Sequence, residues 1–317
     1  MVVVFFGTPQ FGVPTLQHLL DSRHTVAGVV TQPDRPRGRG QHVSHAPVKA
    51  LAIERHLPVL QPERLKPPEV DAALRAWQPD LGVVAAYGKI IPEHLLVIPR
   101  FGMINVHASL LPKYRGAAPV HRAVIDGEPE TGVTIMRLVK ELDAGPMFEK
   151  VTRPIGPDET SDVVERALAD LGARLLVRVV DQIAAGNAHE EAQDPARATY
   201  APRLTKEDGL IDWSQPAVAI HNRVRGLYPW PHAYTFLDGA RLIVLRTHRE
   251  VGAGRTDPPY ASPGIVVRVE RDAILVATGH GEELAIVALQ PEGRRAMTVA
   301  EFLAGRPVIP GAAFTES

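Results

Sequence analysis

The N-terminal residues of the chain form an apolar run, residues 1–7, that is interrupted at Gly7 and Pro9. A run of this kind, without alternation between apolar and polar residues, is typical of a strand buried on both faces of a parallel sheet. Residues 13–20 then carry valine and leucine at helical spacing. A strand, a glycine turn and a helix predict the βα unit of a doubly wound sheet, whose ligands bind beyond the carboxyl ends of the strands. The run is too short to span a membrane, so the sequence predicts neither a signal peptide nor a membrane anchor.

Strand and helix patterns alternate as far as about residue 186 and then change in character. Strands are expected at residues 25–30, 58–60 and 80–86, and helices at residues 46–56, 70–77, 116–124 and 163–183. Short β-like runs follow at residues 241–247, 264–269, 273–278 and 284–289. The first pattern indicates one α/β layer structure, and the second indicates a small antiparallel barrel. The first glycine turn differs from G-x-G-x-x-G, which disfavours a dinucleotide cofactor.

The predicted fold class is therefore α/β, with three parts. Residues 1–188 form a Rossmann-like catalytic domain with a doubly wound, mainly parallel sheet. Residues 189–207 form a polar linker, in which Gln193, Asp194 and Pro195 break any periodicity. Residues 208–317 form a small, open, OB-like β-barrel.

Composition and charge exclude several broad classes of protein. The chain has 317 residues, a formal net charge of -1 and no cysteine. This length is enough for two domains with substantial cores. The near-neutral charge excludes a globally basic nucleic-acid binder, so any RNA contact must use a local patch. The lack of cysteine excludes disulfides and thiolate metal sites and fits a reducing compartment, so we expect a cytoplasmic protein.

Asn105 and His107 stand two positions apart, between the apolar residues Ile104 and Val106. If the backbone is extended here, alternation places both polar side chains on one face. A carboxamide can donate to a developing oxyanion, and an imidazole can transfer a proton near neutral pH. An ordinary polar face at a strand end is the alternative interpretation, and the spacing alone leaves both open.

A third polar candidate, Asp143, follows the predicted strand at residues 130–136 and precedes Gly145. It therefore lies in a glycine turn after a clear strand. An Asn, a His and an Asp on the loops and strand ends of one sheet predict an acid–base constellation.

These segments together resemble a known family. Residues 105–112 read N-V-H-A-S-L-L-P, residues 115–120 R-G-A-A-P-V, residues 130–136 E-T-G-V-T-I-M and residues 142–145 L-D-A-G. In this order they are similar to the motifs of the 10-formyltetrahydrofolate-dependent formyltransferases, and further similarity covers nearly the whole chain. One departure is Ala108, where the family often has glycine.

The resemblance is greatest to family members that act on methionyl initiator tRNA. It implies that a formyl group passes from 10-formyltetrahydrofolate, the co-substrate, to the α-amine of methionine esterified to that tRNA. It also implies that Asn105 and His107 donate to the oxyanion. Asp143 would orient His107, hold its charge state or shuttle a proton through water. Neither a covalent enzyme intermediate nor a metal is required, and we expect a monomer.

The resemblance further implies a folate pocket. The expected positions are Tyr87, Gly88, Ile90, Ile91 and Leu142 around the pterin, with Ser109, Leu110, Leu111 and Pro112 in contact with the folate. A small apolar loop at a strand end is a suitable wall for a flat ring. Simple core packing explains any single one of these residues equally well.

A basic loop is the first candidate for tRNA contact. Residues 31–49 contain four basic residues and one acid among prolines and glycines, which predicts an exposed loop without helix or sheet. Arginine forks bind phosphate oxygens in a bidentate manner. The resemblance implies that Arg35 and Arg39 meet the acceptor arm, whereas a solvated surface loop is the alternative.

A second basic segment, residues 221–231, combines Arg223 and Arg225 with Tyr228 and Trp230. Such a mixture can serve phosphates or bases, or it can be a helix end packed on a core. The C-terminal barrel of the family has the same string and is implied to contact the tRNA. Lys206, near the end of the predicted linker, is a further candidate.

Rival functions remain open on the sequence alone. An amino-sugar N-formyltransferase or a 10-formyltetrahydrofolate hydrolase would share Asn105, His107 and Asp143 but would have less use for the basic segments. A non-enzymatic RNA-binding protein would need the barrel but not the buried constellation.

Overall fold

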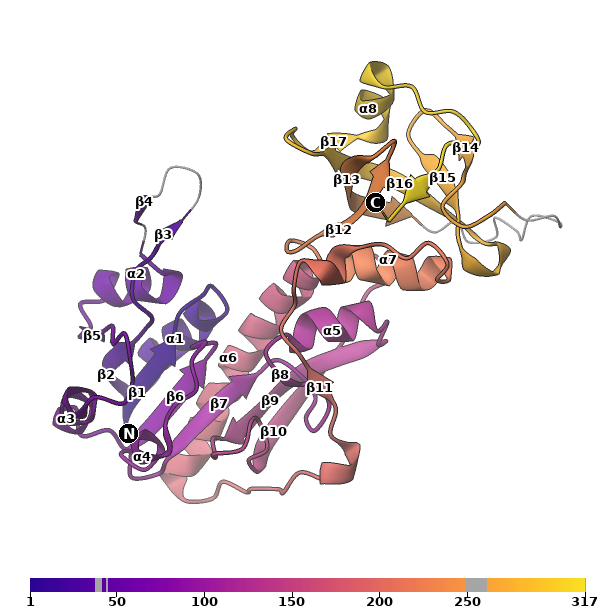
Figure 1. The fold of residues 1–317 in the computed structure, drawn as a ribbon. Coiled ribbons are helices and arrows are strands. Elements are labelled where there is room, and N and C mark those ends of the chain that lie inside the picture. Colours follow the sequence, from indigo (N-terminus) through magenta and orange to yellow (C-terminus); the bar gives the residue numbers. More distant parts are fainter. Residues whose placement is uncertain (38–41, 44, 249–260, 317) are drawn as a thin grey trace. The chain divides into compact units, whose positions relative to one another are not determined.

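The computed structural model describes residues 1–316 apart from 38–41, 44 and 249–260, so Arg39 lies outside the described residues. The chain divides into two compact units (Figure 1). Unit 1 comprises residues 1–119, 130–153 and 165–201, and unit 2 comprises residues 120–129, 154–164 and 202–317. The segment predicted as a linker therefore belongs to unit 1 as far as residue 201, and its last residues belong to unit 2.

Unit 1 is built on a seven-stranded sheet of order β10-β9-β7-β6-β1-β2-β5. Its strands are β1 (Val2–Gly7), β2 (Thr25–Val30), β5 (Val59–Leu60), β6 (Leu81–Ala85), β7 (Met103–His107), β9 (Glu130–Arg137) and β10 (Met147–Pro154). The five strands from β5 to β7 are parallel, and β9 is antiparallel to β7. The predicted Rossmann-like, mainly parallel sheet is confirmed. The strand order reverses at β1, which lies between β2 and β6.

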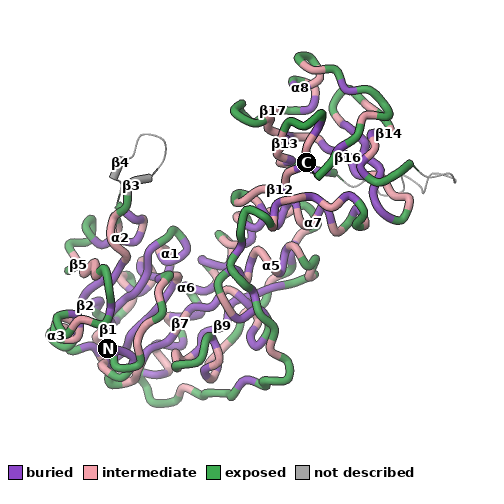
Figure 2. The backbone as a smooth tube through the Cα atoms, viewed as in Figure 1, coloured by how far each residue is buried: buried purple, intermediate pink, exposed green. Residues whose placement is uncertain are grey.

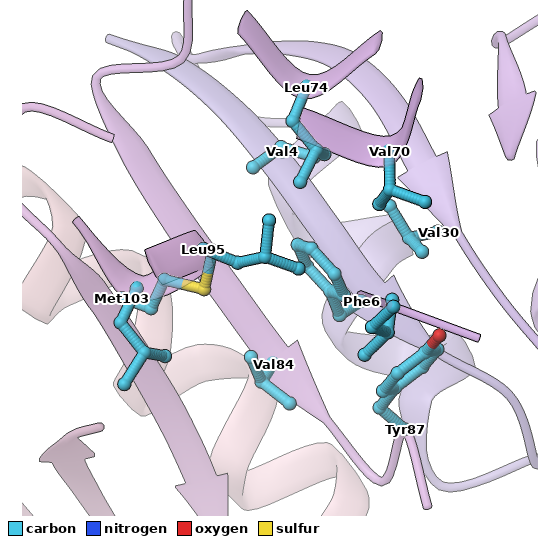
Figure 3. Packing of buried hydrophobic residues seen from close by; sticks show 11 residues of the cluster. Val4, Phe6, Val30, Val70, Leu74, Val84, Tyr87, Leu95 and Met103 are labelled. Atoms are coloured by element: carbon cyan, nitrogen blue, oxygen red, sulfur yellow. The ribbon is translucent and has the colours of Figure 1, made fainter. Parts of the chain in front are cut away.

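Helices cover both faces of this sheet. They are α1 (Gly12–Leu20), α2 (Pro47–Glu54), α3 (Pro68–Ala76), α4 (Glu93–Leu96) and α6 (Ser161–Ala185). On one face, α3 and α4 pack on a buried cluster that includes Phe6 of β1, Leu74 of α3 and Leu95 of α4 (Figure 3). On the other face, Gly172 of α6 lies against Val106 and Val133. The central strands are accordingly buried, as Figure 2 shows.

Two pairs of two-residue strands lie outside the main sheet. β8 (Arg115–Gly116) pairs in parallel with β11 (Tyr200–Ala201). Because Gly116 belongs to β8, the helix predicted from residue 116 begins later, as α5 (Pro119–Ile125). β3 (Pro36–Arg37) pairs with β4 (His42–Val43), so the prediction that the basic loop contains no strand was wrong at these residues.

Unit 2 contains a curled antiparallel sheet of order β14-β15-β16-β13-β12-β18, with β17 paired to β16. Its elements are α7 (Ala217–Gly226), β12 (Ala233–Leu237), β13 (Ala240–His248), β14 (Val266–Val269), β15 (Ile274–Ala277), β16 (Glu283–Pro291), β17 (Met297–Thr298), α8 (Val299–Gly305) and β18 (Phe314–Thr315). A bridge between Ile265 and Ala313 links the first and last strands of the order. The sheet thus curls on itself, which confirms the predicted OB-like architecture.

The longest helix, α6, has 25 residues and carries charged side chains along its length. Among the described residues, no helix has both the length and the apolar character needed to cross a membrane.

The packing of α6 on the sheet gives a test of the fold. A Cβ atom at Gly172 would lie 2.8 Å from Val106 Cγ1 and 3.1 Å from Val133 Cγ1. In Gly172→Leu, overpacking of about 1–3 kcal/mol should exceed the helix-propensity gain of about 1 kcal/mol. We expect a lower Tm by circular dichroism. Ala184→Leu, at an exposed position of the same helix, should keep the wild-type Tm, and equal Tm values for the two variants would contradict this packing.

Candidate active site

The end of β7 places Asn105 and His107 on one face of the sheet, as the alternation predicted. Asn105 lies opposite Val84 in the register with β6. Val84 and Met103 belong to the cluster under α3 and α4, so Asn105 and His107 share that face. Ile104 and Val106 point to the other face and are buried. His107 is 5% exposed, whereas Asn105 is only half-buried.

The imidazole of His107 is held between a backbone carbonyl and a carboxylate. Its Nε2 lies 3.0 Å from the carbonyl oxygen of Tyr114. A carbonyl only accepts, so Nε2 carries a proton and donates. The other nitrogen, Nδ1, lies 3.7 Å from Asp143 Oδ2, which is longer than a direct hydrogen bond. The tautomer is thereby assigned, and the ring faces Asp143 with the nitrogen that can exchange a proton.

Asp143 reaches this position from a loop with an uncommon backbone conformation. Its φ is +47°, in the left-handed region that residues other than glycine seldom adopt. Its Oδ2 accepts a hydrogen bond of 2.8 Å from the amide of Gly116. The structure therefore brings His107 and Asp143 together within unit 1, and Asn105 lies two residues before His107 on the same face of the sheet.

Two buried residues next to Asp143 were not singled out by the sequence analysis as parts of the site, namely Arg115 and Gln193. Gln193 Nε2 donates to the Asp143 carbonyl, and Arg115 donates to Gln193 Oε1. Arg115 is the first residue of the R-G-A-A-P-V motif, so the sequence indicated that this segment belongs to the family pattern but gave Arg115 no role. Gln193 lies in the predicted linker, where no periodicity or motif indicated a role.

The loop after His107 is braced by its own hydrogen bonds. Ser109 Oγ donates to the Lys113 carbonyl at 2.7 Å, and Thr134 Oγ1 donates to the Ser109 carbonyl at 2.7 Å. Lys150 Nζ donates to the Leu111 carbonyl at 2.7 Å. Of the four folate positions predicted here, Ser109, Leu111 and Pro112 are buried and Leu110 is half-buried. The loop is thus rigid and offers mainly the Leu110 side chain.

The predicted pterin loop contains one buried ring and one strongly exposed apolar side chain. The Tyr87 ring packs edge-on against Phe6 in the core (Figure 3). Its hydroxyl is buried and has no hydrogen-bond partner among the described residues. Gly88 is exposed and Ile91 is half-buried. Ile90 is 85% exposed, and Leu142, from the Asp143 loop, is 58% exposed. The apolar surface offered to a ligand therefore comes from neighbours of Tyr87, whose ring itself belongs to the core.

The predicted tRNA residues differ in their surroundings. Arg35 is exposed and lies 3.9 Å from a Glu63 carboxylate oxygen. Lys206 is exposed, and half-buried Arg223 donates through Nη1 to the Asp208 carbonyl.

Arg225 is buried instead. Its Nη1 donates to the carbonyls of Gly156 and Glu159, and burial lowers the pKa of this guanidinium. These bonds give Arg225 a structural role within unit 2.

The arrangement at β7 is suited to acyl or formyl transfer. A half-buried carboxamide, an imidazole of fixed tautomer and a carboxylate lie next to an apolar surface, so donors for an oxyanion and a route for a proton are present. In the part of the chain that the structure describes, no group of three or more His, Asp or Glu side chains is arranged to hold a metal ion.

Residues 1–180 match the family described as formyl transferase, and residues 203–307 match the formyl transferase C-terminal domain. The methionyl-tRNA formyltransferase of Trichlorobacter lovleyi is 49% identical over 309 residues, which is 98% of this chain and 95% of that protein. The methionyl-tRNA formyltransferase of Geobacter sulfurreducens is 48% identical over 315 residues, with 99% and 97% covered.

Solved structures of similar fold have much lower identity. An N-formyltransferase from Helicobacter canadensis, in complex with folinic acid and dTDP-3-aminofucose, has a TM-score of 0.66 and 15% identity, and 90% of this chain and 99% of that chain are covered. HypX from Aquifex aeolicus, in complex with tetrahydrofolic acid, has a TM-score of 0.61 and 15% identity, with 99% and 50% covered. At such identities the likeness establishes the fold alone.

The buried hydroxyl beside the site gives a pH prediction. Burial raises the pKa of Tyr87 from 10.0 to about 12. Between these values the unfolded chain releases the phenolic proton and the folded chain keeps it, so the free energy of unfolding decreases as the pH rises. We expect the wild-type Tm to fall more steeply from pH 10 to pH 12 than the Tm of Tyr87→Phe.

Tyr200→Phe is the matched control, because the Tyr200 side chain is 67% exposed. It should retain the wild-type slope of Tm against pH. A Tyr87→Phe variant with that same slope would show that the Tyr87 hydroxyl is not protected from ionisation by the fold.

Proposed function

The chain belongs to the formyltransferase family, and we propose that it transfers the formyl group of 10-formyltetrahydrofolate to the α-amine of methionine on initiator tRNA. The product, formylmethionyl-tRNA, serves translation initiation. The identity of 48–49% to methionyl-tRNA formyltransferases over nearly their full length supports this substrate. The observation in the structure that supports the chemistry is His107, held between the Tyr114 carbonyl and the Asp143 carboxylate beside an uncommitted Asn105 carboxamide.

The reaction needs an oxyanion stabiliser and a proton acceptor. When the amine nitrogen bonds to the formyl carbon, the carbonyl oxygen gains negative charge, and the bond to the folate nitrogen then breaks. Asn105 donates to the oxyanion, because its carboxamide has no hydrogen-bond partner among the described residues and is partly accessible. Asp143 accepts the proton that the amine loses, and the proton passes to the departing nitrogen.

His107 has a more restricted role than the sequence implied. Its Nε2 proton is used by the Tyr114 carbonyl, so direct donation to the oxyanion from this nitrogen would break an existing bond. Nδ1 faces Asp143 instead. His107 therefore exchanges a proton with Asp143 through Nδ1, and its charge supports the oxyanion through space when the ring is protonated.

The apolar side chains near this group suit the folate. Ile90 and Leu142 are exposed large hydrophobic side chains, and Leu110, in the loop after β7, is half-buried. Apolar walls with a few polar groups are typical of sites for flat ligands. We assign Gly88, Ile90, Ile91, Leu110 and Leu142 to the pterin, with the backbone of residues 109–112 as its support.

The tRNA contacts are assigned to two exposed cations, Arg35 and Lys206, and to half-buried Arg223. Lys206 and Arg223 lie in unit 2 near Asp208, and Arg122 forms an ion pair with the same Asp208 at 3.1 Å. Arg35 supplies a separate exposed guanidinium in unit 1. Such groups bind phosphates by charge and by bidentate hydrogen bonds. Arg225 is left out of this assignment because its guanidinium holds residues 156–159.

The function is tested by incubating the protein with 10-formyltetrahydrofolate and methionyl initiator tRNA and measuring formylmethionine. In parallel, a dTDP-amino sugar replaces the tRNA, and a third reaction contains no acceptor. Formylation of the tRNA alone supports the proposal. Formylation of the sugar, or release of formate without an acceptor, would assign the site to one of the two rival enzymes.

Loss of the catalytic groups should lower turnover. We expect Asn105→Ala and Asp143→Asn each to lower kcat roughly a hundredfold or more, because each removes a group that acts on the transition state. The affinity for tRNA should hardly change. Asn187→Ala and Glu54→Gln, both at exposed positions, are the controls, and turnover in Asp143→Asn equal to that of Glu54→Gln would remove Asp143 from the mechanism.

Loss of the assigned cations in unit 2 should weaken tRNA binding and its salt dependence. Each phosphate contact contributes close to one unit of slope in log affinity against log salt. We expect Lys206→Ala and Arg223→Ala each to reduce the slope, with folate binding intact. Arg75→Ala, at an exposed position on α3, is the control. An unchanged slope in both variants would show that these cations do not contact the tRNA.

A further inference from the structure

Gln193 is buried and uses all the hydrogen-bonding capacity of its carboxamide. Its Nε2 donates to the carbonyls of Asp143 and Gly145, at 2.8 Å each. Its Oε1 accepts from Arg115 Nε at 3.1 Å and from Arg115 Nη2 at 2.8 Å. The reverse orientation of the amide would face carbonyls with an oxygen and a guanidinium with an NH₂ group, so only one orientation satisfies all partners.

These contacts close a ring of hydrogen bonds around Asp143. Gln193 holds the backbone of Asp143, and Arg115 holds Gln193. Arg115 is covalently followed by Gly116, whose amide donates to the Asp143 carboxylate at 2.8 Å. The backbone of Asp143 is thus held by Gln193, and its carboxylate is held by the Gly116 amide. Both contacts are linked through Arg115, which bonds to Gln193 and directly precedes Gly116. This matters because the Asp143 φ of +47° is unfavourable for a residue with a side chain.

We propose that Arg115 and Gln193 are a positioning pair that keeps the Asp143 carboxylate directed at His107. Neither side chain touches a reacting atom, and both act through Asp143. The proposal rests on the function above only in that Asp143 takes part in the proton transfer.

A simpler explanation is that Gln193 only attaches the segment at residues 190–201 to unit 1. That segment already has other attachments, because Glu191 bridges Met147 and β11 pairs with β8. The Gln193 carboxamide bonds instead to the carbonyl of the proposed catalytic acid. The two explanations differ in what they predict for turnover, for substrate affinity and for combined substitutions.

The first test compares three variants of the pair. Gln193→Met removes all four hydrogen bonds at similar length, and Gln193→Glu keeps an acceptor for Arg115 but sets an oxygen against the two carbonyls. We expect kcat to fall about a hundredfold in both, as for a catalytic group displaced by about 1 Å. Both KM values should remain near wild type. Arg115→Lys, with one charged donor in place of two, should retain more activity than either.

Gln182→Met is the matched control. Gln182 is a half-buried glutamine of unit 1, and its Nε2 donates to Glu149 Oε1 at 2.6 Å. It should keep the wild-type kcat. Wild-type kcat in Gln193→Met would overturn the proposal, and so would a rise in KM with kcat unchanged. If Gln193→Met does not fold, Gln193→Glu and Arg115→Lys carry the same comparison.

The decisive measurement combines substitutions. If Gln193 acts only through Asp143, adding Gln193→Met to Asp143→Asn should lower kcat no further than Asp143→Asn alone. If the two losses multiply, Gln193 acts elsewhere and the positioning role is wrong.

Amide hydrogen exchange gives a readout that does not depend on the substrate. The Gly116 amide should exchange faster in Gln193→Met than in the wild type, and Gln182→Met should leave its rate unchanged. Unchanged protection in Gln193→Met would overturn the proposed pair even in an active enzyme. A wild-type protein that fails to formylate the tRNA would overturn the proposed function, while this exchange result would still decide whether the pair positions Asp143.

Discussion

The hydrogen bond from the Gly116 amide to the Asp143 carboxylate is the contact on which the site depends. It directs the acid of one loop toward the end of β7. It requires glycine at residue 116, because the φ there is +122° and a Cβ atom would lie 2.7 Å from the Ala201 carbonyl oxygen. The pairing of β8 with β11 and the direction of the carboxylate therefore depend on the same missing side chain.

The strands and the shared face of Asn105 and His107 could be predicted from the sequence, because both follow from local alternation. The predicted strand at residues 25–30 coincides with β2. Gln193 could not be predicted, because its partner Asp143 lies 50 residues away and its own segment has no periodic pattern. Arg225 shows the same limit, since a guanidinium in a basic, aromatic string resembles a phosphate ligand until the fold places two backbone carbonyls beside it.

Several polar side chains around the site form hydrogen bonds within the fold. Thr134 and Lys150 donate to carbonyls of the loop after β7, and the Ser109 hydroxyl donates within that loop. Large apolar side chains, in contrast, remain exposed at Ile90 and Leu142. A flat ligand would gain apolar contact there, while the loop that supports it is already rigid, so binding need not order the loop.

One backbone carbonyl decides how the proposed catalytic roles are divided. Because the Tyr114 oxygen accepts from His107 Nε2, the imidazole has only Nδ1 for proton exchange, and that nitrogen faces Asp143. A direct hydrogen bond from Nε2 to an oxyanion would forfeit the bond to Tyr114, a net loss of about 0.5–1.5 kcal/mol. The Asn105 carboxamide has no such commitment within the described residues. It is therefore the donor that can meet a new negative charge without a compensating loss in the fold.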